Sequence, residues 1–147
     1  MDHLDPVDIL LVEDSQFDAE LTLRSLAQKH IANPIRVVID GAEALDYLFA
    51  RGNYADFGPY RLPKIILLDL KLPKLNGLEV LAAIKSDERL RTIPVVMVTS
   101  SREDPDIQKA YSLGANSYVI KPIDFDSFSA TIGTLGMYWL LVNQPPI

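Results

Sequence analysis

Six polar residues in this sequence follow short apolar runs, and their types suit the binding and transfer of a phosphoryl group. They are Glu13, Asp14, Asp69, Thr99, Ser100 and Lys121. Carboxylates that lie together repel one another unless a cation joins them, and all-oxygen ligands suit Mg²⁺ or a similar hard ion. The lysine adds a movable positive charge and the threonine adds a hydroxyl donor. Together these groups could bind the oxygens of a phosphoryl group during its transfer.

This chemistry requires a fold that brings distant parts of the chain together. Apolar runs that end at turn residues predict five strands, at residues 9–12, 35–39, 65–68, 95–98 and 118–120. The runs are continuous rather than alternating, which is typical of strands covered on both faces. Apolar residues at helical spacing lie between them, as at Ala42, Leu45 and Phe49. The alternation predicts an α/β fold with a parallel sheet and helices on both of its faces.

The polar residues therefore converge at one edge of the predicted sheet, where ligands bind in folds of this kind. Taken singly, each also has a structural interpretation. Glu13 and Asp14 could cap a helix, Asp69 and Thr99 could form turns, and Lys121 could be a solvated surface lysine. Their combination in this strand order favours a functional site.

Length and composition exclude several other classes of protein. The chain has 147 residues, of which 48% are apolar and 23% charged, as expected for one globular domain over residues 1–147. The absence of cysteine excludes disulfides, thiolate metal sites and cysteine catalysis. A net charge of −6 argues against a nucleic-acid-binding face.

The ends of the chain give two further expectations. The acidic N-terminus lacks the cationic and apolar regions of a signal peptide. The longest apolar run, at residues 137–142, is too short to cross a membrane. We therefore expect a cytoplasmic protein that binds neither nucleic acids nor membranes.

Four motifs together resemble the receiver domain of two-component response regulators, and they span nearly the whole chain. They are Ile9–Asp14, Leu67–Pro73 with Asn76-Gly77, Pro94–Ser100, and Lys121-Pro122. The resemblance implies a flavodoxin-like, doubly wound five-stranded sheet with strand order 2-1-3-4-5. The core would comprise about residues 7–135, followed by a C-terminal extension at residues 136–147.

Other features look like single-domain regulators that are paired with bacterial, especially cyanobacterial, phytochrome histidine kinases. These features are the long loop before Pro63, Ile84-Lys85 leading to Ile93-Pro94, and the terminal Tyr138-Trp139-Leu140. The output would pass through protein contacts or through onward transfer in a relay, since we expect no DNA-binding domain.

The resemblance implies a role for each acidic residue. Asp69 would accept a phosphoryl group from a sensor histidine kinase. Glu13, Asp14, Asp69 and the backbone carbonyl of Lys71 would bind Mg²⁺. Glu13 stands where an aspartate is commoner, and its extra methylene leaves open whether it reaches the metal directly or through water.

The resemblance also implies a switch rather than an enzyme. Lys121 would pair with the phosphoryl oxygens, Thr99 and its neighbour Ser100 would supply hydroxyls to them, and Tyr118 would follow Thr99 inward. The Lys121–Pro122 peptide would be cis, an uncommon state for the bond before proline.

Three other functions remain as alternatives. A metal-dependent phosphatase with an aspartyl nucleophile would need a second aspartate two residues after Asp69, but Lys71 stands there. A flavin- or nucleotide-binding module would carry a glycine-rich phosphate loop, and neither common motif is present. A receiver that is never phosphorylated is the third, although every acidic position and Lys121 are filled.

An apolar stripe continues to the end of the chain. It comprises Phe125, Phe128, Ile132, Leu135, Trp139 and Val142, and it is long for a final helix. Exposed apolar patches usually mark interaction sites, and Trp and Tyr are enriched among interface hot spots. We therefore expect a homodimer or partner surface that includes Phe125, Phe128, Tyr138, Trp139 and Leu140. The alternative is that these residues fold back onto their own subunit.

Overall fold

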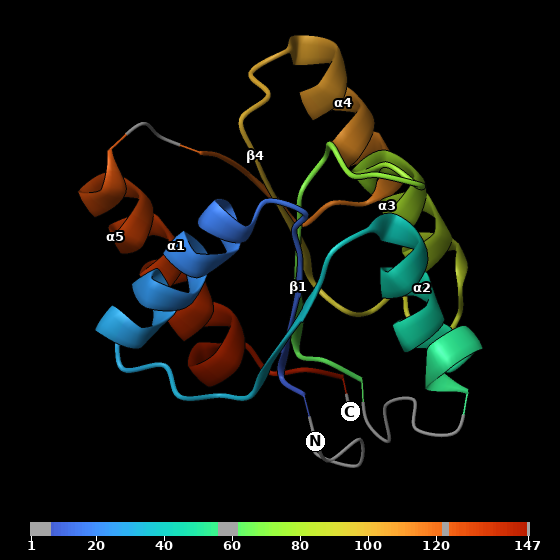
Figure 1. Cartoon of the computed structure of the whole chain (residues 1–147), viewed down its shortest axis with the longest axis horizontal. Helices are drawn as coiled ribbons and strands as arrows, with labels where there is room; N and C mark the ends of the chain where they lie inside the picture. Colours follow the sequence, from blue (N-terminus) through green and yellow to red (C-terminus); the bar gives the residue numbers. More distant parts are fainter. Residues whose placement is uncertain (1–6, 56–61, 122–123, 147) are drawn as a thin grey trace.

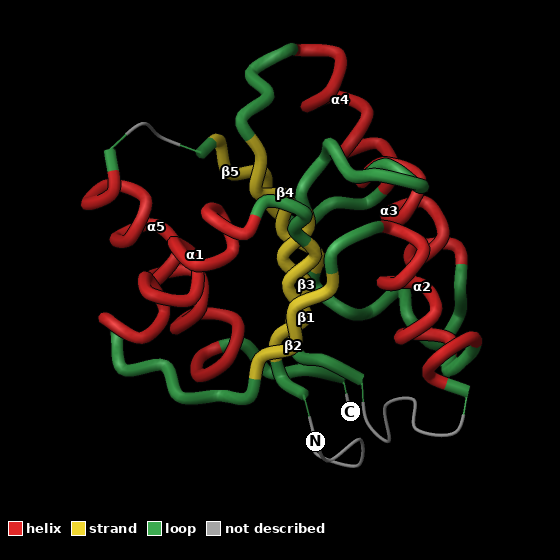
Figure 2. The backbone as a smooth tube through the Cα atoms, in the orientation of Figure 1, coloured by secondary structure: helices red, strands yellow, loops and turns green. Residues whose placement is uncertain are grey.

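Five short strands form one parallel sheet in a computed structural model that describes residues 7–55, 62–121 and 124–146. The strands are β1 (Ile9–Val12), β2 (Ile35–Val38), β3 (Ile65–Leu68), β4 (Val95–Thr99) and β5 (Ser117–Ile120). They lie in the order 2-1-3-4-5, with β3 at the centre and β2 and β5 at the edges (Figure 2). The predicted doubly wound sheet and its strand order are therefore confirmed.

Helices cover both faces of the sheet. On one face lie α1 (Gln16–Gln28) and α5 (Phe125–Met137), and on the other lie α2 (Gly41–Phe49), α3 (Gly77–Ser86) and α4 (Asp104–Leu113), as Figure 1 shows. A short 3₁₀ helix, η1 (Gly52–Tyr54), follows α2, and a π-helical turn, η2 (Tyr138–Val142), follows α5. No helix within the described ranges is long and apolar enough to span a membrane.

The continuous apolar runs result from this two-sided covering. Along β1, Leu10 and Val12 pack in the core beneath α2, α3 and α4, whereas Ile9 and Leu11 pack in the core beneath α1 and α5. Successive side chains of a strand point to opposite faces. A strand with a core on each side therefore needs apolar residues at every position.

The loop between β3 and α3 is held close to the sheet by a glycine. The amide of Gly77 donates to the carbonyl of Leu70 at 2.7 Å. A Cβ at residue 77 would overlap the carbonyl oxygen of Asp69 and would lie 2.7 Å from the Cα of Leu70. The first turn of α3 can therefore approach the end of β3 only because residue 77 has no side chain.

The C-terminal stripe differs from the sequence expectation. Phe128 and Leu140 are buried in the core beneath α1 and α5, so the prediction that they belong to an exposed interface is wrong. Gly136 contributes to this burial, because a Cβ there would lie 2.6 Å from Cδ1 of Ile31. The core therefore reaches Leu140, beyond the boundary expected at about residue 135.

The π-helical turn decides which residues of the tail are covered. It closes with a hydrogen bond from the amide of Asn143 to the carbonyl of Tyr138, five residues earlier. Leu140 faces the core, while Leu141 and Val142 are 70% and 69% exposed. The tail thus folds back on its own subunit and still presents apolar side chains to solvent.

We expect the substitution Gly77→Ala to lower the free energy of unfolding by about 1–3 kcal/mol, because the overlapping atoms belong to the backbone and cannot move cheaply. Denaturant unfolding would measure this loss. Ser86→Ala, an exposed position at the other end of α3, is the matched control and should change the stability little. Equal stability of both variants would contradict the close approach.

Candidate functional site

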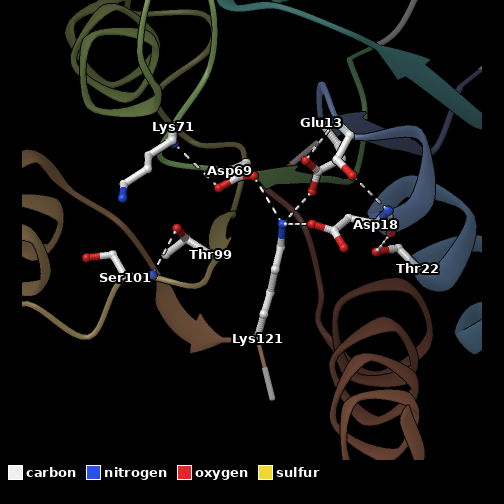
Figure 3. A network of polar contacts seen from close by, with 9 residues as sticks. Glu13, Asp18, Thr22, Asp69, Lys71, Thr99, Ser101 and Lys121 are labelled. Atoms are coloured by element: carbon white, nitrogen blue, oxygen red, sulfur yellow. Dashed lines mark hydrogen bonds and ion pairs between the residues drawn. The ribbon is translucent and has the colours of Figure 1, made fainter. Parts of the chain in front are cut away.

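The carboxyl ends of the strands bring two of the predicted acids, Glu13 and Asp69, together around the ammonium group of Lys121 (Figure 3). Lys121 follows β5, and its Nζ donates to three carboxylates. The distances are 2.7 Å to Oε1 of Glu13, 2.9 Å to Oδ2 of Asp18 and 3.1 Å to Oδ2 of Asp69. Glu13 follows β1 and Asp69 follows β3. One basic group therefore joins elements from both ends of the chain.

The lysine of this cluster and one of its acids are largely withdrawn from water, which strengthens the interaction between their charges. The side chains of Glu13 and Lys121 are only 3% and 13% exposed. Burial raises the pKa of Glu13 to about 7, although the hydrogen bond from Lys121 opposes the rise. Burial alone would lower the pKa of Lys121, but hydrogen bonds to Asp18 and Glu13 and the charge of Asp69 hold it above its ordinary value. Lys121 is therefore charged at neutral pH.

Three carboxylates of this cluster could also hold a metal ion. One carboxylate oxygen of each residue lies within 4.8 Å of those of the other two, in the group formed by Glu13, Asp14 and Asp69. Asp14 is exposed, so this group faces solvent on one side. The donor atoms are all oxygens, which fits a hard divalent cation. The amide of Lys71 donates to Oδ1 of Asp69 at 3.4 Å, and the metal-binding role of the Lys71 carbonyl stays a prediction.

Thr99 and Tyr118 are joined through a residue that the sequence analysis did not identify. The amide of Ser101 donates to Oγ1 of Thr99 at 3.3 Å, and its carbonyl accepts a hydrogen bond from the hydroxyl of Tyr118 at 3.1 Å. The Ser101 hydroxyl donates to Oδ2 of Asp106 in α4 at 2.5 Å. Ser101 is buried and Ser100 is exposed, so the role expected of Ser100 stays a prediction.

Asp18 is the second residue that the sequence analysis missed. It lies in the first turn of α1, where its amide donates to Oγ of the N-cap residue Ser15. An acidic residue in a first turn is usually explained by the helix dipole. The sequence contained one indication that Asp18 belongs to the site. Asp18 lies only four residues after Asp14, and the start of α1 is at the same edge of the sheet as the strand ends.

A shallow groove of about 550 Å³ lies beside the cluster. Its lining residues come from the ends of β1 and β3 and the starts of α3 and α4: Asp14, Leu70, Lys71, Leu72, Pro73, Asn76, Leu78 and Asp106. The cluster is therefore accessible on the side of Asp14. The cis peptide expected before Pro122 involves a residue outside the described ranges.

A doubly wound five-stranded domain with buried acids and a lysine at the carboxyl edge of its sheet has the architecture of a receiver domain. The family model described as the response regulator receiver domain matches residues 9–133. The chain belongs to this family.

The chain aligns with two curated relatives over nearly the whole length of each. The chain is 44% identical over 142 residues to the probable methanogenesis regulatory protein FilR2 of Methanothrix harundinacea, covering 97% of this chain and 89% of that protein. It is 37% identical over 135 residues to the response regulator Rcp1 of Synechocystis sp., covering 92% and 90% of the two chains.

Solved structures of response regulators have the same fold. The phosphorylated cyanobacterial phytochrome response regulator RcpA has a TM-score of 0.87 at 37% identity, covering 97% of this chain and all of its own. The Mn²⁺-bound form of Rcp1 has a TM-score of 0.87 at 35% identity, with 97% and 100% covered. The bacteriophytochrome response regulator RtBRR has a TM-score of 0.76 at 52% identity, with 97% and 84% covered.

A divalent cation should stabilise the folded chain through the acidic cluster. At a cation concentration about 100 times the dissociation constant, mass action should add about 2.7 kcal/mol to the free energy of unfolding. Asp14→Asn should remove most of this gain and, because Asp14 is exposed, should leave the metal-free stability nearly unchanged. Thermal unfolding with and without metal measures both quantities.

Glu20→Gln provides the control for this experiment. Glu20 is exposed in α1 and lies outside the three-carboxylate group, so the variant should keep the full gain from the metal. An undiminished gain in Asp14→Asn would show that the cation binds elsewhere.

Proposed function

We propose that the chain accepts a phosphoryl group on Asp69 from a sensor histidine kinase, with Mg²⁺ as the metal, and changes its protein contacts in response. The observation that carries the proposal is the contact of Asp69 with Lys121 at the carboxyl edge of the sheet. Membership of the receiver family supports it. The exposed Asp14 side of the cluster gives a donor access to this carboxylate.

The transfer needs positioning and neutralisation of charge more than a strong nucleophile, because phosphohistidine is already activated. A carboxylate oxygen of Asp69 forms a bond to phosphorus while the P–N bond breaks. The electron pair of that bond leaves with the imidazole, which takes up a proton. Lys121 neutralises the transferring oxygens, and a bound divalent cation supplies further positive charge to them.

The response would start at the hydrogen bonds of Ser101. A phosphoryl group adds negative charge and acceptor oxygens beside Thr99. The Thr99 hydroxyl turns toward them, which alters its bond with the Ser101 amide, and Tyr118 loses or changes its partner on the Ser101 carbonyl. The loop that begins α4 then shifts between two populated states, by as much as their interaction energies differ.

The kinase partner that we propose is of the phytochrome type. The names of RcpA and RtBRR, which refer to phytochrome systems, support this proposal at 37% and 52% identity. FilR2, at 44% identity, is named instead for the regulation of methanogenesis. Our proposal of a phytochrome-type partner predicts that transfer from a purified kinase of this type is faster than transfer from a kinase of another sensor class. Cytoplasmic location stays a prediction.

The substitution Asp69→Asn should abolish phosphorylation, because it removes the nucleophilic carboxylate. Intact-mass measurement after incubation with acetyl phosphate and Mg²⁺ should show one added phosphoryl group on the natural chain and none on the variant. Asp104→Asn, an exposed position in α4, should be labelled normally. Full labelling of Asp69→Asn at another residue would contradict the assignment, and turnover of phosphomonoesters would favour the phosphatase alternative.

We also propose a homodimer that uses the end of α5 and the π-helical turn. The support is a run of exposed apolar side chains there: Met137, Tyr138, Leu141 and Val142. Trp139 is partly covered by its own subunit, so it contributes at the margin of this surface. Phe125 lies at the other end of α5, beneath the guanidinium of Arg24 at 5.3 Å.

Leu141→Asp should weaken this dimer without unfolding the chain, because Leu141 is 70% exposed. Light scattering at tens of micromolar protein, with Mg²⁺ and a phosphoryl mimic, would measure the change in mass. Phe17→Asp alters an equally exposed apolar residue in α1 and should leave the mass unchanged. A natural chain that is monomeric under these conditions would refute the dimer.

A further inference from the structure

Asp18 differs from the other two carboxylates that bind Lys121. Glu13 and Asp69 both belong to the group of carboxylates that could hold a metal ion, and Asp69 is also the proposed phosphoacceptor. Asp18 lies outside that group and makes a contact of 2.9 Å with the ammonium. Among these three partners of Lys121, it is the one that neither a metal nor a phosphoryl group would engage.

We propose that Asp18 is a positioning residue, which holds the Lys121 ammonium beside Asp69 while Glu13 and Asp69 bind the metal and the phosphoryl group. This inference rests on the proposed function. The inference adds Asp18 to the site as the residue that places the positive charge. It also gives the start of α1 a part in phosphoryl transfer.

The local structure fixes Asp18 well enough for this task. Its amide donates to Oγ of Ser15 at 3.2 Å, and its carbonyl accepts a hydrogen bond from the hydroxyl of Thr22 at 3.1 Å. Further along, α1 is tied to α5 by a hydrogen bond of 2.8 Å between Ser129 and Gln28. The carboxylate of Asp18 thus projects from a packed helix rather than from a loop.

Lys121 needs such an anchor because of its own chemistry. An ammonium on a flexible four-carbon stem has three N–H donors, and here each donor has one carboxylate. When a metal binds the oxygens of Glu13 and Asp69, two of these acceptors lose electron density to it. The remaining contact, with Asp18, keeps the ammonium in place for the oxygens of the incoming phosphoryl group.

The first test observes Lys121 directly and requires no phosphorylation. The ¹H–¹⁵N signal of the Lys121 ammonium should be resolved in the natural chain saturated with Mg²⁺, because a held ammonium exchanges its protons slowly. The signal should broaden or vanish in Asp18→Asn and be retained in Glu20→Gln, which removes the same charge from α1 without touching Lys121. A signal that is unchanged in Asp18→Asn would overturn the inference.

The second test measures the rate of labelling by acetyl phosphate at saturating donor and Mg²⁺. We expect Asp18→Asn to lower the maximal rate about ten-fold, with little change in the half-saturating donor concentration, and Asp18→Glu to restore part of it. Since Asp18 acts through Lys121, Asp18→Asn should add nothing further in a Lys121→Met background. Circular dichroism confirms that each variant is folded.

The outcomes separate the two proposals. A natural chain that gains no phosphoryl group on Asp69 refutes the proposed function, whatever the ammonium signal shows. Labelling of the natural chain together with an unaltered rate in Asp18→Asn refutes the role of Asp18 alone. An equal slowing in the natural and Lys121→Met backgrounds refutes it as well, because the effect would then not pass through the lysine.

Discussion

The charge of Lys121 allows several carboxylates to lie together at one edge of an otherwise apolar sheet. Parallel strands end on the same side, so the residues that follow β1 and β3 are brought close whatever their charge. The carboxylates of Glu13 and Asp69 are largely withdrawn from water, where two negative charges lying close together repel each other strongly. The ammonium from the end of β5 compensates for their repulsion. The site is therefore complete only when the first and last strands occupy the same sheet.

Contacts on two sides of the site position the residues around Lys121. Gly77 lets the start of α3 close against the end of β3, which fixes the backbone of Asp69. On the opposite side, Ser101 bonds through its amide to Thr99, through its carbonyl to Tyr118 and through its hydroxyl to Asp106 of α4. The hydrogen bonds of Ser101 therefore join Thr99 and Tyr118 to a helix on the surface.

The sequence predicts those features that depend on patterns along the chain. Strands buried on both faces give continuous apolar runs. These runs were sufficient to predict the sheet and the convergence of Glu13, Asp69 and Lys121 at one of its edges. Asp18 was missed because a first-turn acid looks the same whether it caps a helix or binds a lysine 103 residues away. The burial of Leu140 was missed because apolar spacing shows which residues share a face, but not whether another helix covers it.

The π-helical turn at the end of α5 has a consequence for how such proteins diverge. In a turn closed over five residues, one inserted or deleted amino acid changes which apolar side chain enters the core and which ones face solvent. That register lies at the C-terminal end of α5, whereas Lys121, which binds the acidic cluster, precedes the N-terminal end of this helix. An insertion or deletion of one codon in the tail therefore alters which apolar side chains the protein presents to solvent and leaves the acidic cluster unchanged.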